Sequence, residues 1–170
     1  MKPESCINFF LISVLAHSLA YADLDLDAED ELSSNTDVIG NYAVVNQVGE
    51  LQAAFILQQG HQNQAISAQR GVANQLELDQ VGSELLVYSS QDGLHNIVNV
   101  SQKGMGNQVL TEQVGNSNRL YATQDGMDIH TKVQQYGDQN LVELEQYGNG
   151  PRSTVIQEGD NLVARVIQGY

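Results

Sequence analysis

Short stretches of the chain alternate between apolar and polar residues with a period of two. Between residues 140 and 146, Val142 and Leu144 fall on one face of an extended chain, and Glu143 and Glu145 fall on the other. Residues 74–80 repeat this arrangement. Such a period is typical of a half-buried β-strand. The pattern predicts twelve strands of about seven residues, which start at 41, 52, 63, 74, 85, 96, 107, 118, 129, 140, 151 and 162.

The predicted strands share an 11-residue repeat, in which Gln is followed by Gly two residues later and, in most copies, by Asn five residues later. The Gln recurs without interruption at Gln47, Gln58, Gln69, Gln80, Gln91, Gln102, Gln113, Gln124, Gln135, Gln146, Gln157 and Gln168. The Gly recurs at Gly49, Gly60, Gly71, Gly82, Gly93, Gly104, Gly115, Gly126, Gly137, Gly148 and Gly159. A period of 11 would also fit a helix of about 3.67 residues per turn. Each Gly would cost that helix about 1 kcal/mol relative to Ala, and the alternation contradicts it, so we predict strands.

The repeat also predicts which side chains face inward. These are the residues seven and nine positions after each Gln, from Ala54 to Val166, and none of them is charged. Charged residues within the strands fall on the outward positions instead, as Glu77 and Lys132 do. Because a slip of one residue would bury these charges, the register is well specified.

Two strands and two turns form a 22-residue coil, so the chain is expected to hold six coils. Stacked at ~4.8 Å, they give a column roughly 29 Å tall, in which each coil contacts only its neighbours. The glycines are expected to lie in the turns and to supply the positive φ of a sharp reversal. The predicted fold is an all-β, two-sheet β-solenoid over residues 41–170.

Gln and Asn at the inward positions predict amide ladders that run along the stack. An amide group carries both donors and an acceptor, so identical side chains in neighbouring coils can bond one another. The Asn side chains expected to take part are Asn63, Asn74, Asn96, Asn107, Asn118 and Asn140. Apolar residues interrupt the Asn positions at Leu85, Ile129, Pro151 and Leu162. No cap is expected over either end, and since folded monomers usually cover open strand edges, the stack is predicted to template amyloid growth.

The N-terminal residues predict secretion. Residues 1–22 have the features of a signal peptide: Lys2, an apolar run over 7–19 that is short for a membrane span, and small residues at 20 and 22. Cys6 is the only cysteine, so the mature chain is predicted to lack disulfides. Seven acidic residues crowd into 23–37. The leader over 23–40 is therefore expected to be disordered or, alternatively, to dock on an export machine.

Charge and side-chain spacing argue against several classes of function. A formal net charge of −14 makes nucleic acid an unsuitable partner. His61, His95 and His130 fall at different positions of the repeat, so we expect no catalytic group, metal ligands or cofactor to converge there. The Gly-rich nonapeptides of calcium-binding solenoids and the outward Thr columns of ice-binding modules are absent. An enzyme or a ligand-binding solenoid is a remote alternative.

The repeat resembles that of the curlin family, whose members are secreted subunits of bacterial curli amyloid fibres. The curlin pattern Gln-x-Gly-x-x-Asn-x-Ala-x-x-x-Gln is matched in full by Gln58, Gly60, Asn63, Ala65 and Gln69. The resemblance covers residues 41–170. Within the family the chain is most similar to the minor, nucleating subunit, through the apolar stretch 83–91 and the basic ending 165–168. The six coils, where a nucleator usually has five, and the acidic leader depart from that subunit.

The resemblance implies a role outside the cell. The chain would cross the inner membrane by its signal, pass the outer membrane through the curli export pore with accessory secretion proteins, and associate with itself and with the major curlin subunit. It would act at the cell surface as a nucleator for adhesion and biofilm. The alternative is a major fibre-forming curlin. The irregular last coil, with Pro151, Arg152 and Arg165, is the candidate contact for an anchoring partner.

Overall fold

The computed structural model describes residues 20–21 and 40–169. It contains thirteen strands in the described residues and no helix there. The strands are β1 (Ala20–Tyr21), β2 (Tyr42–Glu50), β3 (Ala53–His61), β4 (Gln64–Val72), β5 (Gln75–Ser83), β6 (Leu86–Leu94), β7 (Ile97–Met105), β8 (Gln108–Asn116), β9 (Arg119–Met127), β10 (His130–Tyr136), β11 (Leu141–Asn149), β12 (Arg152–Glu158) and β13 (Val163–Gln168). Within these described ranges, no helix is long and apolar enough to cross a membrane.

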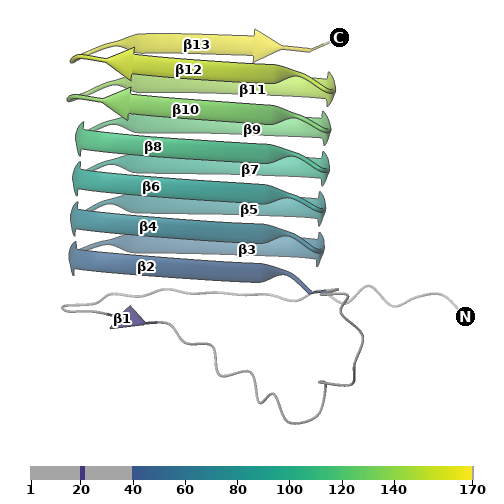
Figure 1. The fold of residues 1–170 in the computed structure, drawn as a ribbon, viewed down its shortest axis with the longest axis horizontal. Coiled ribbons are helices and arrows are strands. Elements are labelled where there is room, and N and C mark those ends of the chain that lie inside the picture. The colour runs from purple at the N-terminus through teal and green to yellow at the C-terminus, as the bar shows by residue number, and fades with distance from the viewer. Residues whose placement is uncertain (1–19, 22–39, 170) are drawn as a thin grey trace, which may run out of the picture.

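The strands form two stacked sheets, and the chain alternates between them (Figure 1). The first sheet has the order β1-β2-β4-β6-β8-β10-β12, and the second has the order β3-β5-β7-β9-β11-β13. From β2 onward every pairing is parallel and joins residues 22 positions apart, as Gln80 pairs with Gln102. Only β1 is antiparallel, where Ala20 and Tyr21 pair with Gln47 and Asn46 of β2. The predicted two-sheet β-solenoid of about six 22-residue coils is confirmed.

The core lies between the two sheets and follows the predicted register. The residues at plus seven and plus nine are buried from Ala54 to Leu144, whereas those in β12 and β13 are half-buried. Leu144 has 1% of its surface exposed, and the charged residues on its own strand point outward. The last coil, made of β12 and β13, is the less buried because no further coil of the described chain covers it.

The turns differ from the prediction in where they reverse. Most strands are nine residues long instead of seven, and in these the Gly is the penultimate residue of the strand. The tight left-handed conformation falls two residues after the Gly, usually on a residue with a side chain: Leu51 has φ 55° and His95 has φ 57°. The predicted positive φ of the repeated glycines is confirmed, but the tight left-handed residue of the reversal is the second one after the Gly and not the Gly itself.

The glycines are needed because neighbouring coils approach closely at these positions. A Cβ atom built on Gly104 would lie 1.8 Å from the carbonyl oxygen of Gly126 in the next coil, and one on Gly93 would lie 2.0 Å from that of Gly115. Gly104 also has φ +116°, a conformation that L-residues rarely adopt. The repeated Gly therefore sets how closely the coils stack.

Candidate functional site

The Gln side chains form two continuous hydrogen-bonded columns, one for each sheet. In every neighbouring pair from Gln47 to Gln168, Nε2 of one Gln donates to Oε1 of the Gln 22 residues later, over 2.7–3.2 Å. All these bonds point the same way along the stack, from the N-terminal coil to the C-terminal coil. The columns therefore have a direction.

Each Gln between Gln58 and Gln135 also joins the two sheets. The second N–H of Nε2 donates to the backbone carbonyl of the residue 16 positions earlier, which lies in the opposite sheet. Nε2 of Gln91 donates in this way to the carbonyl oxygen of Gln75, and Nε2 of Gln113 donates to that of Ile97, both at 3.1 Å. Both donors of these amides are thus satisfied in the dry interior. This bond was not predicted from the sequence, because it depends on how far apart the two sheets lie at the strand ends.

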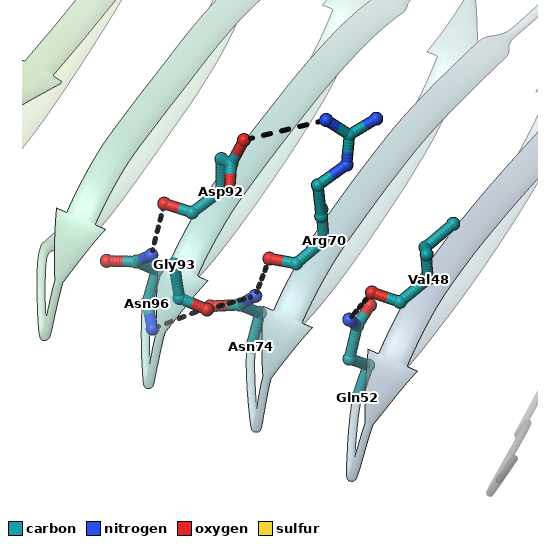
Figure 2. Close-up of polar contacts among 7 residues, drawn as sticks. All are labelled: Val48, Gln52, Arg70, Asn74, Asp92, Gly93 and Asn96. Carbon is teal, nitrogen blue, oxygen red and sulfur yellow. Dashed lines mark hydrogen bonds and ion pairs between the residues drawn. The ribbon is translucent and has the colours of Figure 1, made fainter. Parts of the chain in front are cut away.

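The Asn side chains bond the backbone and not one another, which differs from the predicted ladder. Nδ2 of Asn74 donates to the carbonyl of Arg70, at 2.8 Å, and to that of Gly93 in the next coil, at 3.1 Å (Figure 2). Its Oδ1 accepts from the backbone N–H of Asn96 at 3.0 Å. Each such Asn fixes its own turn and bridges to the coil above. We call this arrangement the Asn clamp.

The bridge to the next coil recurs at all six Asn positions that the sequence singled out, and the bond within the Asn's own turn recurs at all of them except Asn118. The bond to a glycine carbonyl of the next coil measures 2.7–3.1 Å at Asn63, Asn74, Asn96, Asn107, Asn118 and Asn140. The donor half of this role is filled by Gln52, whose Nε2 donates to Val48 at 2.7 Å and to Gly71 at 3.0 Å, while its Oε1 has no partner among the described residues. Figure 2 shows Gln52 aligned with Asn74 and Asn96. The sequence reasoning missed Gln52, although its position in the repeat marks it.

Apolar residues break the clamp at defined coils. Leu85 and Ile129 are fully buried, and each donates its N–H to the Asn of the coil before, at 3.1 and 3.0 Å. They offer no acceptor to the coil that follows. Pro151 follows Ile129 in this column and has no N–H that would need one. Ile129 has no side-chain acceptor for an N–H at position 151. Since proline has no N–H, it leaves no donor unpaired there.

Ion pairs connect neighbouring coils on the outer faces. Arg70 lies 4.0 Å from Asp92, and Lys103 lies 3.6 Å from Asp125. Their side chains are about half exposed or more, so such pairs add little to stability. These ion pairs therefore contribute less to the stability of the stack than the buried amide hydrogen bonds do.

The candidate anchoring residues are not brought together. Arg165 in β13 faces Glu143 and Glu145 of β11, at 3.8 and 3.9 Å. Arg152 begins β12 in the other sheet and is exposed. The two arginines therefore lie on opposite outer faces, and only Arg165 is paired with acids. A partner that contacts the last coil would meet one basic residue on each face.

One polar cluster lies on the outer face of the first sheet. The Tyr136 hydroxyl donates to Glu112 at 2.7 Å, and the Gln134 amide donates to the same carboxylate oxygen at 2.8 Å. These bonds hold the pKa of Glu112 below its ordinary value and raise the pKa of Tyr136. The cluster borders an open hollow of about 350 Å³ that Tyr88 and Lys132 also line.

The histidines are likewise scattered. His61 ends β3, His95 lies in a turn and His130 begins β10. Within residues 20–21 and 40–169, no group of three or more His, Cys, Asp or Glu side chains is placed to hold a metal ion. The feature that repeats through the whole molecule is the pair of amide columns with their clamps.

Comparison with known families fits this geometry. Residues 126–159 match the curlin associated repeat. The matched curlin segment runs from the end of β9 through β12 and includes Gln135, Gln146 and Gln157 of the columns. It covers about a fifth of the chain and supports a relationship to the curlin family. No curated protein and no solved structure matches the chain.

Proposed function

We propose that the chain is a secreted structural subunit of curli amyloid fibres. The carrying observation is the pair of continuous Gln columns in a parallel two-sheet stack, because such a column extends by adding an identical amide at either end. The curlin match in residues 126–159 supports the same role. In this role the molecule is a template and not an enzyme.

Within the fibre we propose the role of the surface-bound nucleator, which starts polymerisation of a major curlin. The support is the division of the chain into regular coils and an irregular last coil, which carries Pro151 and Leu162 at the clamp positions. The major fibre-forming subunit is the alternative, and the unbroken clamps from Asn74 to Asn140 in the second sheet favour it. A nucleator needs one regular end that templates the major subunit and one end that makes a different contact. The chain as a whole fits this division better than it fits a uniformly regular major subunit.

The proposed route to the cell surface rests on the N-terminal residues. The predicted signal peptide over 1–22 and the acidic leader over 23–40 lie outside the described residues, apart from Ala20, Tyr21 and Gly40. Secretion, passage through the curli export pore with its accessory proteins, and a place in the fimbrium at the cell surface are therefore parts of this proposal. Adhesion and biofilm formation would follow from the fibres.

The first test is assembly. The chain from residue 23 onward, diluted from denaturant at micromolar concentration, is expected to gain β-structure, bind an amyloid dye and shorten the lag of a major curlin added in excess. Circular dichroism and dye fluorescence measure these changes. The matched control is the Leu144→Asp variant, which should show none of these three changes. A monodisperse monomer that persists for days would contradict the proposal.

The second test concerns the last coil. Deletion of residues 150–170 is expected to leave seeding of a major curlin in solution within about twofold of the parent, because the regular coils remain. The same deletion should release fibres from the producing cells, if Pro151, Arg152 and Arg165 belong to the contact with an anchoring partner. Cell-bound fibre is compared at equal secretion. Full retention by the shortened chain would show that the last coil has no anchoring task.

A further inference from the structure

The two ends of the solenoid offer different hydrogen-bonding groups. Every Gln column bond runs from Nε2 of one coil to Oε1 of the next, and every clamp donates from its side chain to a glycine carbonyl of the next coil. The N-terminal coil, β2 and β3, therefore presents side-chain and glycine acceptors toward a coil placed below it, together with the two N–H groups that bond clamp oxygens. The C-terminal coil, β12 and β13, must supply donors to a coil placed above it.

The N-terminal coil has a complete set of such groups. Among the described residues, no donor reaches Oε1 of Gln47 or Gln58, and Oε1 of Gln58 is buried without a partner. The carbonyl of Gly49 corresponds to those of Gly71 and Gly93, which the side chains at the clamp positions of the coil before bond. The N–H groups of residues 41 and 52 correspond to those that donate to a clamp oxygen in later coils. We call these groups the N-terminal edge.

The C-terminal coil cannot complete that set. Nε2 of Gln157 and Gln168 can continue the two columns. Pro151 and Leu162, however, occupy the two clamp positions, and neither side chain carries a donor or an acceptor. A second copy of this chain, stacked by its C-terminal coil under the N-terminal edge, would lack both clamps. A complete clamp makes two bonds between coils, one donated by Nδ2 and one accepted by Oδ1.

We propose that the N-terminal edge is the binding face for a partner solenoid, and that the partner is a chain of the same 22-residue period whose C-terminal coil has Asn at both clamp positions. This inference rests on the proposed function and deepens it, since it assigns the templating end. Growth proceeds from β2 and β3, and no partner coil adds to the C-terminal coil. Binding of a regular partner is favoured over binding of a second copy by the clamp bonds to the Gly49 carbonyl and to the N–H groups of residues 41 and 52.

Among the described residues N-terminal to Gly40, only Ala20 and Tyr21 lie on this edge. Strand β1 pairs only with Asn46 and Gln47 of β2, and it belongs to the residues predicted to be removed with the signal. The edge of β3 has no strand neighbour on its N-terminal side among the described residues. The tests therefore use the chain from residue 23 onward.

The probe is a polypeptide of six tandem copies of residues 63–84, a coil with Asn63 and Asn74 at its two clamp positions. Seeds of the parent chain are expected to shorten its lag. The variant Gln47→Leu with Gln58→Leu removes both edge acceptors and should reduce seeding about tenfold or more, because two buried hydrogen bonds are lost at the junction. The matched variant, Gln157→Leu with Gln168→Leu, loses two column bonds at the other end and should seed like the parent.

A label readout identifies the growing end directly. Single cysteines are introduced at outward positions by Val44→Cys in β2 and Thr154→Cys in β12, and energy transfer to a probe labelled at its C-terminus is measured. Transfer is expected from position 44 alone. The gain-of-function variant Pro151→Asn with Leu162→Asn should add transfer at position 154 to a probe labelled at its N-terminus.

Equal transfer from both positions in the parent, or equal seeding by the two Gln variants, would overturn the assignment of the end. A parent that shortens the lag of a major curlin and shows this symmetric behaviour would leave the proposed function intact. A parent that seeds neither the probe nor a major curlin would overturn both.

Discussion

Replacement of Leu144 by Asp is expected to prevent folding of the solenoid around coil five. The Leu144 side chain is 1% exposed between the two sheets, so the variant would bury an unpaired carboxylate at a cost of several kcal/mol. A loss of that size is comparable with the whole stability of an ordinary domain. Urea titration of the freshly refolded, unassembled chain, followed by circular dichroism, measures the loss.

The neighbouring Glu143 provides the control for this experiment. Its side chain is 47% exposed and its ion pair with Arg165 is at the surface. Glu143→Lys is therefore expected to change the free energy of unfolding by less than about 1 kcal/mol. Equal sensitivity at 143 and 144 would show that the strand register is wrong.

Replacement of Gly104 by Ala is expected to break the stack by a different route. The added Cβ would lie 1.8 Å from the carbonyl oxygen of Gly126, so the two coils would have to separate. Backbone strain at φ +116° adds to the clash. We expect a destabilisation of about 3 kcal/mol or more, measured as a shift of the urea midpoint.

The Gly159→Ala variant tests the effect of backbone strain in the absence of the clash. Gly159 has a similar φ of +125°, yet the nearest atom to its Cβ position is Cδ1 of Leu162, at 3.8 Å. Gly159→Ala should therefore cost only the strain of the left-handed conformation, about 1–2 kcal/mol. If both alanines were equally harmful, close approach of the coils would not be the reason for the repeated Gly.

The fold was predictable because its signals repeat. The alternation at Val142 and Leu144 gives the inward face, and the 11-residue period places the same face in every strand. The absence of charge at the inward positions then specifies the register, since any slip would bury residues such as Glu77. Local pattern and long-range stacking agree here, and no tertiary contact overrides the propensity of the strands.

The details of the amide bonds were not predictable from the same signals. An inward Asn has a short side chain that reaches the backbone of its own turn, whereas the longer Gln side chain reaches the next Gln. The position in the repeat also matters, because Gln52 stands at an Asn position and bonds the backbone of its turn as Asn74 does. The turn residue itself, such as His95 at φ 57°, carried no signal because many residue types occupy that position.

The constant separation of 22 residues between paired positions has a consequence for the rate at which the chain becomes ordered. Closing each coil has the same entropic cost as closing the one before, since the loop does not lengthen as the stack grows. A chain delivered end first, through a narrow passage, can therefore complete one coil after another while the remainder is still extended. Its folding time follows the speed of delivery, and no segment has to wait for a distant one.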